Sequence, residues 1–431
     1  MQKILIKNAS VVDPSQKLNK EILDILIQDG RIAKLAKNIK AQADTVIDAS
    51  GKIVIPGLVD MHVHLREPGR EDKETVASAT MAALKGGVTS VLAMPNTSPA
   101  IDSRGSLELL KGIIKDSGSA NVFICAAITK ERQGKVLTDI PALKQSGAIA
   151  ISDDGESVDD EKLLSLAAKL AKESAVALIC HCEDKKLSNN GVVNLGIIST
   201  KLGLRGISKE SEYKRVERDI KLAEKAKAAI HIAHVSCKES VEIIGRAKKR
   251  GVKVTAETAP HYFSLTQDNL SGYDTNMKMN PPLRTAEDVE AVKQGLRSGI
   301  IDAIASDHAP HTENEKDIEF ERAEFGVIGL ETELAVSISE LLQKGILDWA
   351  GLVEKLALNP AKILGIDRGT LQAAKPADIA IISADKKWTV SKQRFASKSK
   401  NSAFLGRELT GVVEYTICGG EIVYKNETSL K

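Results

Sequence analysis

The sequence has few aromatic residues and no excess of either charge. Aromatic residues make up 3% of the 431 residues, and the 60 Lys and Arg nearly balance the 58 Asp and Glu. Because the two charge signs are interspersed, the chain has no basic stripe of the kind that binds nucleic acid. We therefore expect a small molecule as the ligand, and neither nucleic acid nor a membrane as a partner.

Long apolar runs are also missing. No stretch is long enough to span a bilayer, and the amino terminus alternates apolar and polar residues through Ile4 and Ile6, unlike the continuous apolar core of a signal peptide. The five cysteines are an odd number without paired spacing. This usage favours a reducing compartment, so we expect a cytoplasmic protein with buried cysteines.

The middle of the chain, residues 54–366, alternates short apolar runs with helical patterns such as 161–172 and 240–250. Eight such units predict an α/β fold, a (β/α)8 TIM-type barrel, in which the chemistry lies just after the strands. The predicted strands are Ile55–Val59, Ser90–Ala93, Val122–Ala126, Ala148–Ile151, Val176–Cys180, Ile230–His234, Lys253–Ala256 and Ile301–Ala305.

The two ends of the chain differ from the middle in their pattern of apolar and polar residues. Residues 1–53 and 367–431 contain short alternating strands broken by turn residues, with carboxy-terminal runs at 377–382, 412–418 and 421–424. We expect the ends to pair into a small β-sandwich beside the barrel.

Reactive residues cluster where the barrel strands are predicted to end. His62 and His64 lie two apart, so they point to the same side of an extended segment and can bind one metal ion. The alternative is a pair of solvent-facing histidines in a loop, since such pairs occur by chance.

The remaining candidate ligands favour the metal site. Five predicted strand ends deliver nitrogen and oxygen ligands to one face, which suits Zn²⁺ in mixed coordination. Besides the two histidines, these ligands are Asp153 and Asp154, His181, His234 and Asp307.

Other reactive residues have plainer interpretations. Cys180 and Cys182 bracket His181 but point away from it on a strand, which favours packing over sulfur ligation. His231 should face away from His234. His261 either lines the site or packs in its loop, and His308 is placed to support a ligand.

Six stretches closely resemble the dihydroorotase family, in its longer bacterial class called type I. The resemblance extends from residue 1 to about residue 378. A generic amidohydrolase would share the two histidines and the late aspartate, but not the arginine at 66 or the block at 280–284. The stretches are Gly57–Gly69, Met94–Thr97, Ser152–Gly155, Asn280–Arg284, Ser306–His311 and Gly329–Thr332.

The resemblance implies one or two zinc ions per subunit in a metal-dependent hydrolase barrel. Related hydantoinases and dihydropyrimidinases bridge two metals with a carboxylated lysine, but residues 147–154 contain no lysine, and an aspartate takes its place. Glu324 departs from the proline usual in the family. By resemblance His62, His64 and Asp307 would hold one metal, His181 and His234 a second, and Asp154 would reach both.

The resemblance also implies the reaction, the reversible hydrolysis of the cyclic amide of dihydroorotate to N-carbamoyl-aspartate. Asp307 would act as the catalytic acid and base. Arg66, Asn96 and His311 would bind the substrate carboxylate, the arginine through its planar fork. The full set of implied substrate contacts is His64, Arg66, Asn96, Asn280, His311, Phe325 and Gly326.

Several alternatives stay open at this level. Arg66 could form a surface salt bridge with Glu67 or Glu71, Asn96 could be a turn residue, and the charged segment 312–324 could be a mobile lid or a solvated loop.

The function itself also has alternatives. The chain could be a hydantoinase, dihydropyrimidinase or allantoinase, although an uncharged ring needs no carboxylate clamp. It could also be a catalytically silent scaffold, although every expected ligand is present. Association with aspartate transcarbamoylase, or into a homo-oligomer, is not decided by the sequence.

Overall fold

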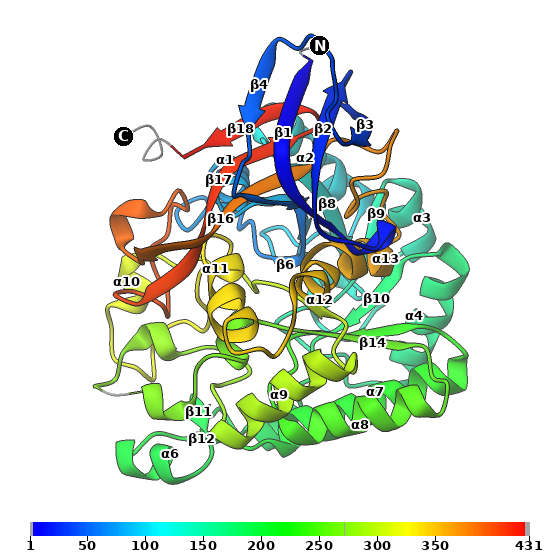
Figure 1. The fold of residues 1–431 in the computed structure, drawn as a ribbon. Coiled ribbons are helices and arrows are strands. Elements are labelled where there is room, and N and C mark those ends of the chain that lie inside the picture. The colour runs from blue at the N-terminus through cyan, green and yellow to red at the C-terminus, as the bar shows by residue number, and fades with distance from the viewer. Residues whose placement is uncertain (1–2, 271, 427–431) are drawn as a thin grey trace.

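Eight short apolar runs in the middle of the chain form the parallel strands of a barrel. The computed structural model describes residues 3–270 and 272–426 (Figure 1). Neighbouring barrel strands follow one another in chain order, and a bridge between Val63 and His308 joins the first strand to the segment after the last. The predicted barrel is therefore confirmed. Its strands are β6 (Leu58–Val63), β7 (Val88–Ala93), β8 (Asn121–Ala126), β9 (Ala148–Ile151), β10 (Ala177–Cys180), β13 (Ile230–Ile232), β14 (Val254–Thr258) and β15 (Ala303–Ile304).

At least one helix follows each barrel strand. Several helices begin at a capping box, in which the side chains of the cap residue and of the residue three positions later accept each other's backbone N–H, as in Thr75 with Ser78 and Thr285 with Asp288. The barrel helices are α1 (Val76–Lys85), α2 (Arg104–Ser117), α3 (Ile140–Gln145), α4 (Glu161–Ser174), α7 (Glu210–Ala226), α8 (Lys238–Lys249), α9 (Ala286–Ser298), α11 (Glu333–Ser337), α12 (Trp349–Val353) and α13 (Asn359–Leu364).

Two short insertions complete the barrel region. One lies between β10 and α7, and the other follows β15. Their elements are α5 (Lys185–Ser188), β11 (Val193–Asn194), α6 (Ile197–Leu202), β12 (Gly206–Ile207) and α10 (Glu313–Lys316).

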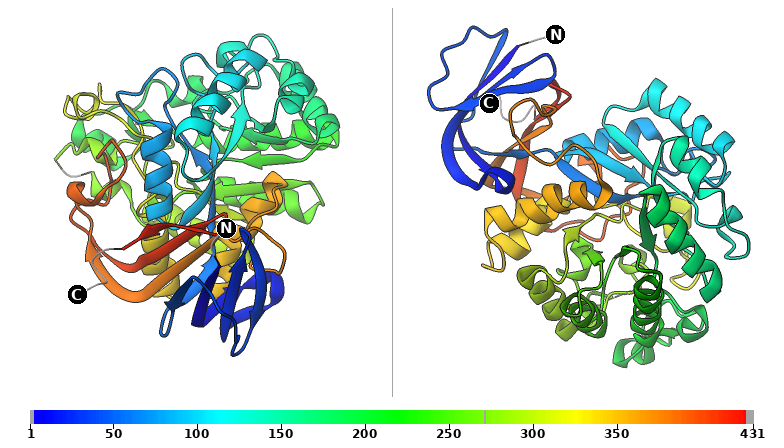
Figure 2. Two further views of the ribbon diagram at one scale, coloured as in Figure 1. Left: turned by 90° about the horizontal axis from the view of Figure 1, so that it is seen from above. Right: turned by 90° about the vertical axis from the view of Figure 1, so that its right-hand side faces the viewer.

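The two ends of the chain meet in one eight-stranded sheet beside the barrel (Figure 2). Strand β5 pairs antiparallel with β16, with Ile55 opposite Ala380, so the predicted pairing of the ends is confirmed. Residues 1–2 and 427–431 of the predicted end units lie outside the described residues. The strands of this sheet are β1 (Ile4–Asp13), β2 (Leu18–Gln28), β3 (Arg31–Ala36), β4 (Thr45–Asp48), β5 (Ile53–Pro56), β16 (Ile379–Thr389), β17 (Glu408–Cys418) and β18 (Glu421–Lys425).

The first predicted barrel strand, residues 55–59, spans two strands of different sheets. β5 ends at Pro56 in the terminal sheet, and β6 begins at Leu58 in the barrel. A Cβ atom at Gly57 would lie 2.2 Å from Oγ1 of Thr89, so only glycine permits this close approach. Apolar residues alone could not reveal the break, because both strands are buried.

The connection between β16 and β17 leaves the terminal sheet and packs against the barrel. Ser397, Ser399 and Asn401 are buried there. The hydroxyl of Ser399 donates to the backbone oxygen of Lys73, just before α1. A polar stretch of the carboxy-terminal region therefore reaches the barrel wall.

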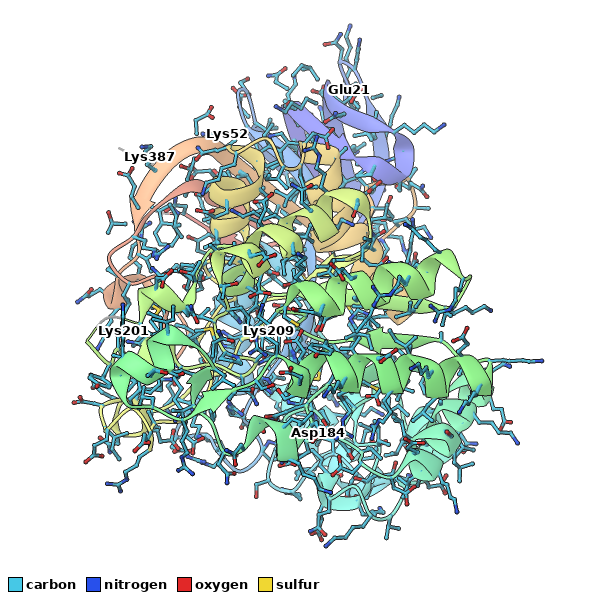
Figure 3. The ribbon with its side chains drawn as sticks, turned by 90° about the horizontal axis from the view of Figure 1, so that it is seen from below. Glu21, Lys52, Asp184, Lys201, Lys209 and Lys387 are labelled. Carbon is cyan, nitrogen blue, oxygen red and sulfur yellow. The ribbon has the colours of Figure 1, made fainter. Side chains whose placement is uncertain are left out.

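Charged side chains of both signs cover the surface, as Figure 3 shows for Asp184, Lys201 and Lys209 on the face seen from below. Lys209 also closes a contact between helices, since its Nζ atom donates to Oδ1 of Asp288 at 2.7 Å. Within residues 3–270 and 272–426, the helices are all too short or too polar to cross a membrane.

Candidate active site

Six acidic and histidine side chains gather at the carboxyl end of the barrel strands. They come from the ends of five strands, and all but Asp307 are buried residues. The residues are His62 and His64 on and after β6, Asp154 after β9, His181 after β10, His234 after β13 and Asp307 after β15.

Asp154 lies at the centre of this cluster. Its Oδ1 atom is 3.2 Å from Nε2 of His62, 3.7 Å from Nδ1 of His181 and 3.7 Å from Nε2 of His234. Its Oδ2 atom is 3.6 Å from Nε2 of His64. One carboxylate therefore faces both pairs of histidines.

The donor atoms are arranged as metal ligands would be. His62, His64 and Asp154 form one group of ligand atoms, and Asp154, His181 and His234 form a second. Nδ1 of His181 lies 2.7 Å from Nε2 of His234. Among the described residues, Nε2 of His62 and Oδ1 of Asp154 have no hydrogen-bond partner although both are buried. Buried polar atoms without partners are costly, and a cation would satisfy them.

Asp307 lies beside the first group. Its Oδ1 atom lies 3.3 Å from Nε2 of His64 and 3.6 Å from Nε2 of His62. Its backbone has φ of 49°, and those of His234 and Arg66 are 35° and 62°. Positive φ is unfavourable for such residues, so the backbone is strained at these three positions of the site.

The carboxylates of Asp154 and Asp307 favour positive charge at His62. Burial alone would lower the pKa of His62, but Asp154 and Asp307 raise it well above its usual value. Burial would raise the pKa of Asp307, but His62 and His64 hold it well below its usual range. Burial lowers the pKa of His64, which favours the neutral imidazole that binds metals.

Glu257 supports His62 from the barrel interior. Its Oε1 atom lies 2.7 Å from Nδ1 of His62, and its Oε2 atom lies 3.3 Å from Nε2 of His231. Burial would raise the pKa of Glu257, but His231 and His62 lower it to about 2. A carboxylate that accepts from Nδ1 leaves Nε2 of His62 free to act as a ligand. The sequence did not identify Glu257, although an acid directly after the predicted strand Lys253–Ala256 was a usable signal.

Glu183 has a similar relation to the second histidine pair. Its Oε2 atom lies 3.4 Å from Nε2 of His181 and accepts from Nδ2 of Asn280 at 3.0 Å. Burial would raise the pKa of Glu183, but its contact with His181 brings the pKa to about 2. This residue was also missed, because it lies beyond the strand in an irregular segment.

Arg66 and His311 lie together on one side of the site. Nε of Arg66 donates to the backbone oxygen of Pro310 at 3.1 Å, and its Nη2 atom lies 3.3 Å from Nε2 of His311. Burial lowers the pKa of Arg66 to about 10, so it stays charged at neutral pH. The surface salt bridge with Glu67 or Glu71 is absent from the ion pairs of the described residues.

Phe325 and Gly326 lie against His311. The backbone oxygen of Phe325 accepts from Nε2 of His311 at 2.8 Å. Gly326 has φ of 115°, and an added Cβ atom would lie 2.6 Å from Cβ of Ala309. Glycine is therefore required here by both conformation and space.

Asn96 and Asn280 contact residues in and beside the histidine and aspartate cluster. Oδ1 of Asn96 accepts from Nδ1 of His64 at 2.8 Å, and Asn280 donates to Glu183. Both residues thus orient the side chains of the cluster, in addition to any contact with a substrate. The contact of Asn96 with His64 shows that Asn96 is not merely a turn residue, which was the alternative interpretation of the sequence.

The remaining candidates lie around the cluster. His261 is buried against the ring of Tyr262, and its Nε2 atom has no partner among the described residues. Nε2 of His308 lies 3.4 Å from Oε2 of Glu74. The five cysteines are unpaired, and Cys180 and Cys182 are buried outside both ligand groups.

Solved structures with the same architecture include hydantoinases and a dihydropyrimidinase. An L-hydantoinase from Arthrobacter aurescens superposes with a TM-score of 0.89 at 25% identity, covering 99% of this chain and 96% of that one. A dihydropyrimidinase from Brevibacillus agri has a TM-score of 0.86 at 22% identity, covering 99% and 95% of the two chains. The second likeness shows the fold alone.

Proteins related in sequence identify the family more specifically than the solved structures do. A family model described as dihydro-orotase-like matches residues 51–240. A dihydroorotase from Elusimicrobium minutum is 52% identical over 426 residues, covering 99% of this chain and 98% of that protein. A dihydroorotase from Geobacter sulfurreducens is 51% identical over 422 residues, covering 98% and 99%. At this identity over nearly the whole length, the chain belongs to the dihydroorotase family.

Proposed function

We propose that this chain is a dihydroorotase, which reversibly hydrolyses the cyclic amide of (S)-dihydroorotate to N-carbamoyl-L-aspartate, the third step of de novo pyrimidine (UMP) biosynthesis. The observation that carries the proposal is the pairing of a histidine and aspartate cluster with Arg66 and His311 at one barrel mouth. The substrate has both a cyclic amide and a carboxylate, so it needs both halves of such a site.

The metal in this proposal is zinc. His62, His64 and Asp307 would hold one ion, His181 and His234 a second, and Asp154 would contact both. A bound zinc ion polarises a carbonyl group and lowers the pKa of water to roughly 7. The donor set of imidazole and carboxylate suits zinc, and the unpartnered buried atoms of His62 and Asp154 support the assignment.

Asp307 would move the proton. Hydrolysis requires one proton to leave the attacking water and one to reach the departing ring nitrogen, and a single carboxylate can serve both steps in turn. Asp307 is supported in this role because it combines a position beside His62 and His64 with a partly open side chain, which is 13% exposed against 5% for Asp154.

The substrate carboxylate would bind to Arg66, Asn96 and His311. Arg66 is a charged group with a planar fork of donors that matches a carboxylate. Asn280 and the backbone of Phe325 and Gly326 would hold the amide edge of the ring, with His64 close to the reacting carbonyl. Burial around Arg66 strengthens this attraction relative to water.

Hydantoin hydrolysis is the second candidate, favoured by the structural likeness to L-hydantoinase. A ring without a carboxylate would gain nothing from Arg66, so the two activities are separable. Purified protein should be assayed with dihydroorotate and with hydantoin, alongside elemental metal analysis. We expect turnover of dihydroorotate and bound zinc. Turnover of hydantoin alone would replace the proposed substrate, and turnover of neither by zinc-loaded protein would favour a silent scaffold.

The setting of the enzyme is part of the same proposal. We place it in the cytoplasm, as a free-standing homo-oligomer or in a complex with aspartate transcarbamoylase. Size-exclusion chromatography with light scattering, with and without that transcarbamoylase, measures both forms of association.

A further inference from the structure

We propose that Asn401, in the connection between β16 and β17, is a positioning residue for the substrate-binding side of the site. The residue is 5% exposed, although it lies in a stretch rich in serine and lysine. The inference rests on the proposed function, because it concerns His311 and the backbone of Phe325 and Gly326.

The side chain of Asn401 joins two segments of the barrel mouth. Its Nδ2 atom donates to the backbone oxygen of Ala309 at 3.1 Å and to that of Gly326 at 3.2 Å. Its Oδ1 atom accepts from the backbone N–H of His311 at 3.2 Å. Its own backbone oxygen accepts from the N–H of Ile328 at 3.0 Å.

An asparagine side chain is suited to this arrangement. It offers two donors and an acceptor on one small planar group, whereas aspartate has no donor when ionised and serine has a single hydroxyl. Two carbonyls and one N–H face the group, so a single side chain here contacts all three backbone atoms only if it is an amide.

Lys316 and the backbone of Lys278 hold the same segment. Nζ of Lys316 donates to the backbone oxygens of Glu324 at 2.8 Å and Gly326 at 3.1 Å. The N–H of Gly326 donates to the backbone oxygen of Lys278 at 2.9 Å. The oxygen of Gly326 is thus fixed by two donors, one of them from the carboxy-terminal connection.

The consequence falls on the ring of His311. Its Nε2 atom donates to the backbone oxygen of Phe325, and Nζ of Lys73 lies 3.1 Å from its Nδ1 atom. Asn401 holds the backbone of His311. It also holds the backbone of Gly326, the residue after Phe325, whose oxygen accepts from the His311 ring. Without the amide, the two segments can separate, and the ring loses its fixed orientation toward the substrate carboxylate.

A purely structural role of Asn401 would affect stability but not substrate binding. The test therefore measures stability and substrate binding separately. Asn401→Ala and Asn401→Ser are compared with Asn359→Ala as a matched control. Asn359 also donates from Nδ2 to a backbone oxygen, that of Asp302, at 3.0 Å, but at the opposite end of β15.

We expect both Asn401 variants to raise KM for dihydroorotate by about tenfold, the loss of roughly 1.4 kcal/mol, with kcat within about threefold and zinc content unchanged. Asn359→Ala should leave KM within about twofold of the parent at a similar drop in Tm. A KM near that of the parent in the Asn401 variants, or a fall in kcat or zinc as large as the rise in KM, would overturn the proposal. So would failure of both Asn401 variants to fold when the control folds.

Failure of the proposed function is recognised separately, because the parent protein would then not turn over dihydroorotate. The crystal structure of Asn401→Ser next to that of the parent decides the inference in that event. We expect Nε2 of His311 and the oxygen of Phe325 to move beyond about 3.5 Å, the outer limit of a hydrogen bond. An unchanged contact would overturn the positioning role.

Discussion

Oδ1 of Asp154 lies 3.2 Å from Nε2 of His62, and neither atom has a hydrogen-bond partner among the described residues. Asp154 follows β9 and His62 lies within β6, next to its last residue, so this contact crosses the mouth of the barrel. Two buried polar atoms that lie close together without a hydrogen bond are a liability in an ordinary core. A shared metal ion would remove that liability.

Metal removal should abolish activity. Prolonged chelation is expected to reduce turnover of dihydroorotate to background, and added zinc should restore it. Zinc should also raise Tm, because a ligand that binds only the folded state stabilises it. The measurements are turnover, elemental analysis and thermal unfolding on the same sample. Full turnover by protein shown to be metal-free would contradict the assignment.

Arg66→Met should impair catalysis with dihydroorotate far more than folding. Loss of a charge-assisted pair in a partly desolvated site costs on the order of 2 to 5 kcal/mol, which corresponds to roughly 30-fold to several-thousand-fold in kcat/KM. Zinc content should not change. Arg246→Met is the control, because Arg246 lies on the exposed face of α8, paired with Glu242 at 3.6 Å. Near-normal kinetics in Arg66→Met would show that the carboxylate binds elsewhere.

Asp307→Asn should lose about two to four orders of magnitude in turnover, the usual contribution of general acid–base catalysis. Asparagine has nearly the same size, keeps one ligand oxygen and tolerates the φ of 49° at this position, but it cannot carry the proton. The metal held by His181 and His234 should remain. Hydrolysis and ring closure should be slowed alike, and a variant within a few-fold of the parent would assign the proton transfer to another residue.

Glu257→Gln should weaken zinc binding at the His62 side of the cluster. The carboxylate accepts from Nδ1 of His62, and the loss of such supporting acceptors typically lowers metal affinity by about 10- to 100-fold. Competition with a chromophoric chelator measures the affinity. Glu287→Gln is the control, since Glu287 pairs with Lys238 on the surface at 2.7 Å. Equal zinc affinity in the two variants would speak against a supporting role for Glu257.

Lys316 should make stability depend on pH. Burial lowers its pKa to about 7 in the folded chain, whereas lysine in an unfolded chain titrates near 10.4. Between these values the unfolded state binds more protons, so the contribution of this residue to stability increases as pH rises through the window.

Lys316→Met removes this dependence. The free energy of unfolding of the parent should therefore increase relative to that of the variant from about pH 7 to about pH 10, measured by urea unfolding. The exposed residue Lys201 provides the control Lys201→Met, which should follow the parent. A constant difference between the parent and Lys316→Met across that range would mean that Lys316 titrates normally.

The cluster of candidate metal ligands was predictable, because the position of each residue relative to its own strand is visible in the sequence. Alternation along an extended segment puts His62 and His64 on one side, and barrel geometry brings residues after parallel strands to one face. His181 and Asp307 follow their strands as expected, whereas His234, predicted to end its strand, lies two residues beyond the end of β13 at Ile232. The sequence did not predict the positive φ values of His234 and Asp307.

The sequence by itself determined the barrel, the pairing of residue types with strand ends, and the family. Only the tertiary structure decided which distant side chains share a hydrogen bond. Glu257 meets His62 because the barrel closes, and Asn401 meets His311 because the connection after β16 folds back onto the barrel mouth. Neither pair follows from periodicity, since the strand repeat specifies the direction of a side chain but not its partner from another part of the chain.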